Sequence, residues 1–243
     1  MSHWIASLAA MVCSRILSAG RRDRLSLTPE DLTALRLSFS QFGEDLIIAE
    51  HLVNLRRPSR GIYIDAGCFD PSRFSNTRLL SLMGWKGLNV DASEEVVERF
   101  RKARPSDETV CAALSDTAEA NEFVQTPGGA GSRLARGAVP LPAHAAIRSR
   151  HSIVTRTLED VVDHSRFASE PVDLLDIDCE GADLAVLRGF GLAKRRPVLI
   201  CIEAHSDGEK TEIRSYLEGQ SYTYLCRRGP SLLFRDTHTI QQP

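Results

Sequence analysis

From residue 61 onward, short apolar runs alternate with longer stretches in which apolar positions recur every three or four residues. The short runs, typical of buried strands, are residues 61–66, 86–91, 110–114, 172–178 and 197–203. The stretches of helical period are residues 75–83, 158–162, 182–189 and 209–217, and another helix begins after Ser93. Because strands that alternate with helices pair in parallel, the pattern predicts an α/β fold with a mostly parallel, twisted sheet and helices on both faces.

Three segments depart from this alternation. Residues 222–226 and 232–234 flank a polar turn, which predicts an antiparallel strand pair at the C-terminal end of the sheet. Residues 126–152 are rich in Gly and Pro with little apolar period, so we expect a mobile loop on the substrate side. Residues 4–19 are mostly apolar, are interrupted by Arg15 and precede basic residues. They predict an amphipathic helix that caps the domain or, alternatively, contacts a membrane surface.

Composition narrows the class of protein. The chain has 243 residues, 42% hydrophobic and 26% charged, which are ordinary globular proportions. We divide it into a helical extension at residues 1–38 and one domain at residues 39–243. The 30 Lys and Arg residues nearly balance 32 Asp and Glu residues, so nothing in the charge favours a nucleic-acid partner. The 6 cysteines form no C-x-x-C pair, which favours a reducing, cytoplasmic location.

Polar side chains follow most of the predicted strands. In a parallel sheet the carboxyl ends of the strands meet at one edge, and ligands bind there. The residues at these ends are Asp65 and Gly67, Asp91, Leu114 and Ser115, Asp178 and Glu180, and Glu203 and His205. The sequence therefore predicts an acidic ligand site at this edge, although Asp and Ser also cap helices and form turns.

The turn after the first strand distinguishes between cofactors. Residues 65–71 read DAGCFDP, with one glycine and an additional acid in place of the Gly-x-Gly-x-x-Gly of dinucleotide-binding turns. A phosphate would meet Asp70 there, so the turn favours a cofactor that has a ribose and a cationic amine but no phosphate. S-adenosylmethionine has these features. Asp91, at the end of the second strand, is placed to accept hydrogen bonds from both ribose hydroxyls.

Asp178, Glu180, Glu203 and His205 are the candidates for a catalytic base. Side chains two residues apart in an extended chain point the same way, and neighbouring carboxylates raise each other's affinity for a proton. A base of this kind would remove the proton of a hydroxyl acceptor. In the alternative interpretations, Asp178 orients the cofactor while Glu180 caps a helix, or the acidic cluster binds Mg²⁺ or Ca²⁺. No spacing is diagnostic of a metal site, so we assign no metal ligands.

Several motifs, in order between residues 39 and 203, resemble the FkbM-type family of S-adenosylmethionine-dependent methyltransferases. They are SQFGEDL (40–46), YIDAG (63–67), SNT (75–77), GWKGL (84–88), AALS (112–115) and IDCEG (177–181). Two departures stand out. The family usually has Glu-Pro where this chain has Asp91 and Ala92, and residues 68–70 replace a commoner Ala-Asn type of turn.

The resemblance implies a Rossmann-like methyltransferase fold with S-adenosylmethionine along the ends of the first three strands. By this resemblance Asp65 and Gly67 line the methionine part, and Asp91 with Ala92 lies at the ribose. Ala113 and Leu114 are then expected near the adenine. Gln41 and Asp45 from SQFGEDL, and Asn76 from SNT, complete the expected cofactor-binding set.

We therefore expect a cytoplasmic O-methyltransferase whose acceptor, by resemblance to the family, is a small molecule or glycan: a sugar, a glycan precursor or a secondary metabolite. Arg133, Arg136, Arg148 and Arg150 would suit an anionic or glycan acceptor. Phe42 and Trp85 are expected to pack rather than to bind substrate. Two rival functions are a non-catalytic module that binds S-adenosylmethionine, and a metal-dependent hydrolase that uses Asp178 and Glu180.

Overall fold

The computed structural model describes residues 34, 36–53, 60–135 and 146–238. The chain divides into two compact units, Met1–Leu37 and Ser38–Pro243, and every helix and strand with described bounds lies in the second. The N-terminal helix predicted at residues 4–19 lies outside the described residues. Among the residues that are described, no helix combines the length and the apolar character needed to cross a membrane.

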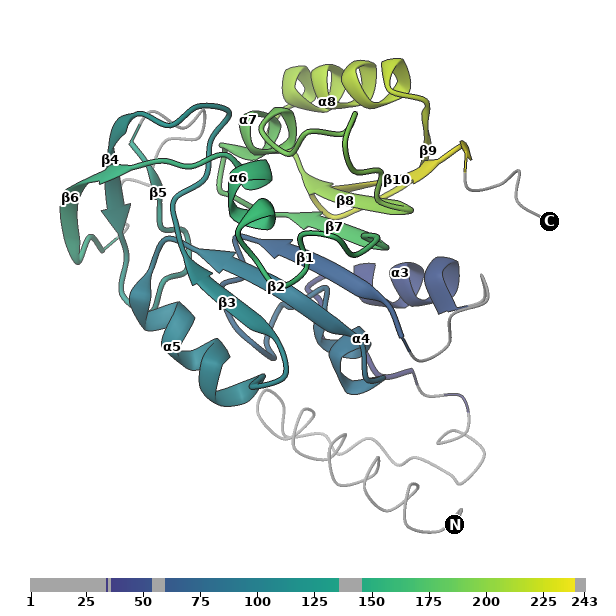
Figure 1. Cartoon of the computed structure of the whole chain (residues 1–243), viewed down its shortest axis with the longest axis horizontal. Coiled ribbons are helices and arrows are strands. Elements are labelled where there is room, and N and C mark those ends of the chain that lie inside the picture. Colours follow the sequence, from purple (N-terminus) through teal and green to yellow (C-terminus); the bar gives the residue numbers. More distant parts are fainter. Residues whose placement is uncertain (1–33, 35, 54–59, 136–145, 239–243) are drawn as a thin grey trace, which may run out of the picture. The chain divides into compact units, whose positions relative to one another are not determined.

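The second unit is built on a seven-stranded sheet with the order β3-β2-β1-β7-β8-β10-β9 (Figure 1). Its strands are β1 (Ile62–Ala66), β2 (Lys86–Asp91), β3 (Glu108–Cys111), β7 (Leu174–Ile177), β8 (Leu199–Glu203), β9 (Tyr222–Arg228) and β10 (Ser231–Asp236). The first five strands in this order, β3, β2, β1, β7 and β8, are parallel. Strand β10 runs antiparallel to both β8 and β9. The predicted mostly parallel sheet with an antiparallel C-terminal pair is confirmed. Its strand order reverses at β1, which places a ligand site at the ends of β1 and β7.

Helices cover both faces of this sheet (Figure 1). They are α3 (Glu44–Val53), α4 (Arg78–Leu82), α5 (Glu94–Ala103), α6 (Leu158–Asp163), α7 (Asp183–Arg188) and α8 (Asp207–Gly219). Residues of α6, α7 and α8 share one apolar cluster with Ile64 and Leu175, while residues of α3 and α4 share another with Tyr63 and Leu174. Because neighbouring residues of a strand face opposite sides, the two clusters are the two faces of the sheet. Trp85 is buried in the second cluster, in the packing role predicted for it.

The prediction of a structureless loop at residues 126–152 was wrong. Part of this segment forms β5 (Arg133–Leu134) and β6 (Ser149–Val154), which pair antiparallel with β4 (Ala120–Gln125) in a separate three-stranded sheet. Most side chains of β6 are exposed and polar, so the strand has little apolar period for a sequence to reveal. Backbone hydrogen bonds to a segment more than twenty residues away hold it in place. Residues 136–145 lie outside the described part of the chain.

Two predicted elements are shorter in the structure than in the prediction. The third strand ends at Cys111 rather than at residue 114, because the chain there leaves β2 and Leu114 bridges to Arg156 instead. The first helix after β1 begins at Arg78 rather than at residue 75. Ser75 and Thr77 are held before it by hydrogen bonds from a buried arginine, Arg104.

Candidate functional site

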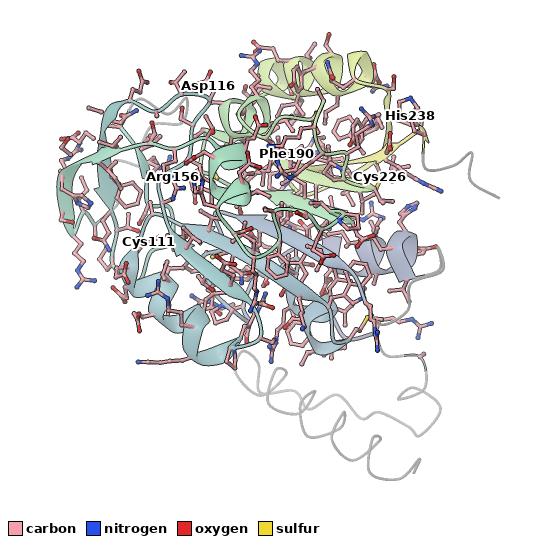
Figure 2. The ribbon with its side chains drawn as sticks, in the orientation of Figure 1. Cys111, Asp116, Arg156, Phe190, Cys226 and His238 are labelled. Carbon is pink, nitrogen blue, oxygen red and sulfur yellow. The ribbon has the colours of Figure 1, made fainter. Side chains whose placement is uncertain are left out.

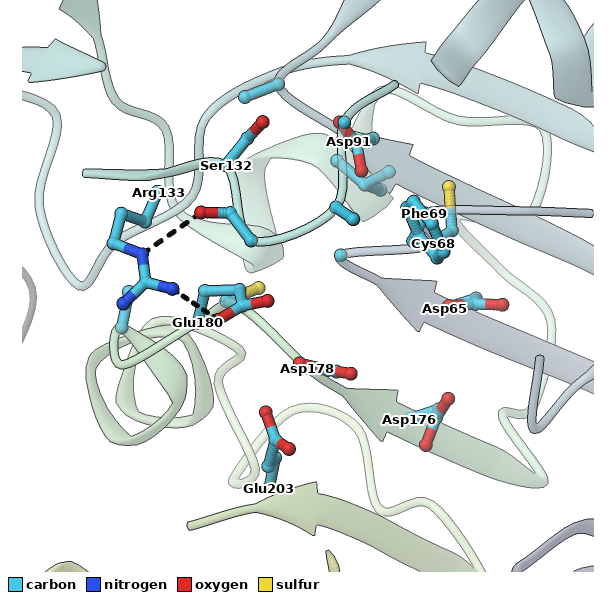
Figure 3. Close-up of a pocket in the computed structure, with 18 of the residues that line it drawn as sticks. Asp65, Cys68, Phe69, Asp91, Ser132, Arg133, Asp176, Asp178, Glu180 and Glu203 are labelled. Atoms are coloured by element: carbon cyan, nitrogen blue, oxygen red, sulfur yellow. Dashed lines mark hydrogen bonds and ion pairs between the residues drawn. The ribbon is translucent and has the colours of Figure 1, made fainter. Parts of the chain in front are cut away.

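A cavity of about 350 Å³ lies at the carboxyl ends of the parallel strands (Figure 3). All but one of the predicted cofactor-binding residues and all the base candidates line it: Gln41, Asp65, Gly67, Asn76, Asp91, Ala92, Ala113, Leu114, Asp178, Glu180, Glu203 and His205. They come from segments far apart in the sequence, which the parallel sheet brings to one edge. The structure thus assembles the residues in one place, and their individual roles remain predictions.

Asp45 is the exception, since it is not among the described residues that line the cavity. It is 1% exposed at the start of α3, where its carboxylate accepts hydrogen bonds from the hydroxyls of Ser38 and Ser40 and from the backbone N–H of Phe39. It fixes the chain that enters the helix. Its neighbour Glu44 lines the cavity instead. Adjacent residues at a helix start point about 100° apart, so only one of the two acids in SQFGEDL faces the cavity.

Gly67 lets two strands approach each other at the floor of the cavity. Its φ is +87°, and a Cβ atom added there would stand 1.8 Å from the carbonyl oxygen of Asp178. The Gly67 N–H donates to the carbonyl of Val90 at 2.8 Å. The turn therefore requires glycine twice, for its left-handed backbone and for the space that it leaves between β1 and β7.

Asp65 is held by a network that sequence reasoning did not assign to the site. Thr77 donates its hydroxyl to Asp65 at 2.5 Å, and Arg104 donates to the Thr77 hydroxyl at 2.8 Å. Arg104 is 2% exposed and also donates twice to the carbonyl of Pro71. Burial raises the pKa of Asp65, although the Arg104 charge and the Thr77 hydrogen bond oppose the rise. Arg104 thereby ties α5 to the turn that follows β1.

Asp91 ends β2 as a half-buried carboxylate at the cavity wall. It accepts a hydrogen bond from the backbone N–H of Ser93 at 2.7 Å, which shapes the entry into α5. Burial raises its pKa to about 6 despite that bond. Beside it the wall is apolar, formed by Ala92, Val90, Ala112, Ala113, Leu114 and Phe123. A carboxylate next to an apolar slot suits a ribose that carries a flat base.

A deeper pair joins the SNT motif to β7. Asn76 donates its side-chain amide to Asp176 at 3.1 Å, and both residues line the cavity. Asp176 is 4% exposed. Burial and, after it, the charge of Asp65 raise its pKa well above the usual range.

The predicted base candidates form a contiguous chain at the ends of β7 and β8. His205 Nε2 lies 3.1 Å from Glu203 Oε2, and the Glu203 carboxylate shares a hydrogen bond with Asp178. Desolvation and the Glu203 charge raise the pKa of Asp178 well above its usual range. Burial alone would raise the pKa of Glu203, but the bonds from His205 and Asp178 outweigh it and lower that pKa. The bond to Glu203 raises the pKa of His205 to about 9.

Glu180 anchors the loop that closes one side of the cavity. It takes a left-handed backbone with φ of +52°, and its carboxylate pairs with Arg133 at 2.9 Å (Figure 3). Asp183 is fully buried and accepts the N–H groups of Cys179 and Gly181. Asp183 therefore cross-links the turn before α7, whereas the carboxylate of Glu180, considered as a helix cap, pairs with Arg133 instead.

The arginines proposed for an anionic acceptor are paired with acids of this chain. Arg133 pairs with Glu180, Arg148 with Glu95 and Arg150 with Glu122. Arg136 lies outside the described residues. In three of the four arginines, the charge proposed for an anionic acceptor is thus already paired within the chain.

The charge of the cavity fits a cationic cofactor. Its walls carry seven carboxyl side chains, those of Glu44, Asp65, Asp91, Asp176, Asp178, Glu180 and Glu203, and the cations Arg73, Arg133 and His205. S-adenosylmethionine carries two positive groups, a sulfonium and an ammonium, and one negative carboxylate. Its net positive charge therefore lowers the electrostatic cost of placing these carboxyl side chains close together. Its purine and ribose match the apolar wall and Asp91. Among the described residues, no group of three or more His, Cys, Asp or Glu side chains is arranged to hold a metal ion.

The sequence profile of the Methyltransferase FkbM domain matches residues 65–226. Among solved structures, the chain is similar to a TehB-like SAM-dependent methyltransferase from Corynebacterium glutamicum, with 14% identity over 96% of this chain and 98% of that chain and a TM-score of 0.39. It is also similar to Aeropyrum pernix fibrillarin with natively bound S-adenosyl-L-methionine, with 12% identity over 78% and 72% and a TM-score of 0.37. No curated protein matches the chain.

Proposed function

Because the chain belongs to the FkbM methyltransferase family, we propose that it methylates a hydroxyl group of a sugar, a glycan precursor or a secondary metabolite. Its use of S-adenosylmethionine and its methyltransferase class follow from the family. The choice of a hydroxyl acceptor rests on one observation, the chain of Asp178, Glu203 and His205 that faces the cavity. A hydroxyl must lose its proton during transfer, and this cluster offers a group to receive it.

Several residues of this chain would hold the cofactor. Asp91 would accept hydrogen bonds from the ribose, and Ala113 and Leu114 would pack against the adenine. Asp65 and the open backbone at Gly67 would face the methionine part, and Gln41 and Asn76 line the same cavity. When bound, S-adenosylmethionine supplies an electrophilic methyl group.

We assign Asp178 as the general base that receives the proton of the acceptor hydroxyl. Of the two hydrogen-bonded carboxylates it has the higher pKa, so its ionised form is the stronger base. Glu203, which His205 keeps ionised, then accepts a hydrogen bond from the protonated Asp178. Activity should therefore rise with pH through the raised pKa of Asp178, and fall above about pH 9 as His205 loses its proton.

Asp178→Asn tests this assignment because the variant keeps the shape of the side chain and removes the base. Methyl transfer should fall by about 10²- to 10⁴-fold, the range typical of a lost general base. Calorimetry should still detect binding of S-adenosylmethionine. Asp116→Asn, at an exposed aspartate (Figure 2), is the matched control and should leave both unchanged. Methyl transfer by Asp178→Asn at the wild-type rate would refute the role of Asp178. If the wild-type chain transfers a methyl group to no hydroxyl, the result favours a module that only binds the cofactor.

We also propose a cytoplasmic location. The cysteines at positions 68, 111, 179, 201 and 226 are free, and the labelled Cys111 and Cys226 lie well apart in Figure 2. Free thiols of this kind persist in reducing compartments. Separation of a cell lysate into cytosolic, membrane and secreted fractions, with antibody detection of the chain, tests this proposal.

A further inference from the structure

Phe74 is an exposed aromatic residue on the wall of the cavity. It is 53% exposed and lines the cavity together with Arg73 and Asn76. Asn76, two residues further on, donates to Asp176 on β7. The segment that carries Phe74 is thus anchored to the strand that leads to Asp178, and its ring stands at the opening of the same cavity.

The backbone at Phe74 is strained although its side chain is more than half exposed. Its φ is +58°, in the left-handed region that bulky residues avoid. The Arg73 guanidinium lies 5.4 Å from the centre of the Phe74 ring and 5.6 Å from that of Phe69. Arg73 therefore supports one face of the Phe74 ring, and the exposed part of the ring is left for another group. Strain that holds a solvent-exposed aromatic ring at a cavity is typical of a ligand contact.

The charge of the cavity restricts what that group can be. Seven carboxyl side chains line the walls, against three lining cations. Arg133 pairs with Glu180 and His205 with Glu203, while Arg73 lies against the rings of Phe69 and Phe74. A phosphate or carboxylate on the acceptor would add negative charge to this excess. Carboxylates accept hydrogen bonds from hydroxyls, and an aromatic face packs against the C–H face of a saturated ring.

We propose that Phe74 is a stacking platform for an uncharged, polyhydroxylated ring of the acceptor, such as a pyranose, and that the site rejects anionic acceptors. This inference rests on the proposed function and deepens it, because it names the residue that selects the acceptor. The ring would lie on Phe74 while its hydroxyls reach the carboxylates of the inner wall.

Binding is tested on the full chain saturated with S-adenosylhomocysteine, by saturation-transfer NMR. The probes are the methyl pyranosides of glucose, galactose, mannose and rhamnose, with glucose 6-phosphate and mannose 6-phosphate as charged counterparts. We expect at least one neutral pyranoside to bind with its C–H protons saturated, and the phosphates to bind more weakly. Failure of every neutral pyranoside to bind, or tighter binding of a phosphate, overturns the proposal.

Variants of Phe74 separate a platform from a structural residue. Phe74→Ala and Phe74→Gly should weaken pyranoside binding about tenfold, while Phe74→Trp should retain it. Leu82→Ala is the matched control, since Leu82 is also 53% exposed but is not among the described lining residues. Phe74→Gly should in addition melt at an equal or higher temperature, because glycine relieves the left-handed backbone.

The results also distinguish this proposal from the proposed function. Wild-type binding by Phe74→Ala overturns the platform but leaves methyl transfer intact. Pyranoside binding that depends on Phe74, with no transfer to any bound pyranoside, supports the platform and contradicts methylation of such a hydroxyl. Unaltered binding of S-adenosylmethionine by every variant, measured by calorimetry, shows that the cofactor site is undisturbed.

Discussion

Replacing Asp91 by Asn should make the protein more stable at neutral pH and weaken its hold on the cofactor. Asp91 is half-buried, and burial raises its pKa from 3.8 to about 6. The folded state therefore binds a proton more tightly than the unfolded chain does. Stability is lost as pH rises from about 4 to about 6, and the full penalty is present above that range.

The magnitude follows from this change in pKa. At about 1.4 kcal/mol per pKa unit, the ionised carboxylate costs the folded state about 3 kcal/mol at pH 8. Asn keeps one oxygen that can accept the Ser93 N–H but loses the second acceptor, which costs about 1 kcal/mol. The variant should thus be about 2 kcal/mol more stable than the wild type at pH 8, and slightly less stable at pH 4.

Urea unfolding at pH 4, 6 and 8, without cofactor, measures this change in the sign of the stability difference. Calorimetry with S-adenosylmethionine measures the affinity for the cofactor. Loss of the ionised acceptor for two ribose hydroxyls should raise the Kd by about 10- to 100-fold. Asp116→Asn removes an exposed charge and should change neither quantity. Equal stability differences at all three pH values would refute the role of burial, and wild-type affinity in Asp91→Asn would refute the ribose assignment.

Three other substitutions test the surroundings of the site. Gly67→Ala forces a Cβ to within 1.8 Å of the Asp178 carbonyl oxygen and should cost about 2 to 4 kcal/mol of unfolding free energy. Gly43 also has a left-handed backbone, but a Cβ there would have nothing within 4 Å, so Gly43→Ala should cost about 1 kcal/mol. Arg104→Lys leaves part of a buried network without donors, and urea unfolding should show a loss of about 3 kcal/mol or more. His205→Gln should shift the acidic limb of the pH profile of kcat to higher pH and abolish the decline above about pH 9. The reason is that the variant lacks the imidazolium that keeps Glu203 ionised. An unchanged profile would exclude His205 from the cluster.

The sheet could be predicted because each of its central strands is buried on both faces. Such strands appear in the sequence as short apolar runs, so β1, β2, β7 and β8 lie where their composition indicates. The second sheet gives no comparable signal. Only Phe123 and Val124 of β4 are buried, and β6 is mostly exposed. Its pairing depends on backbone hydrogen bonds between distant segments, which composition does not record.

The site divides in the same way. Residues at strand ends, such as Asp91 and Asp178, were predictable because the topology alone brings strand ends together. Arg104 has no comparable signal in the sequence, because its contacts with the turn after β1 depend on a side chain that crosses between segments. Phe74 has no sequence signal at all, since its exposure and its left-handed backbone arise from the folded chain.

The acidic cavity connects these observations, because the carboxylates that we place around the cofactor destabilise the protein when the cavity is empty. Burial raises the pKa of Asp65, Asp91, Asp176 and Asp178, so each resists ionisation in the empty cavity. A bound sulfonium and ammonium favour the ionised forms and lower these pKa values again. Binding of S-adenosylmethionine should therefore release protons near neutral pH and grow stronger as pH rises through about 6, where Asp91 ionises. An affinity that is flat between pH 5 and 8, or calorimetric heats that do not depend on the ionisation enthalpy of the buffer, would show that the carboxylates do not sense the cation and would undo the assignment of this cavity.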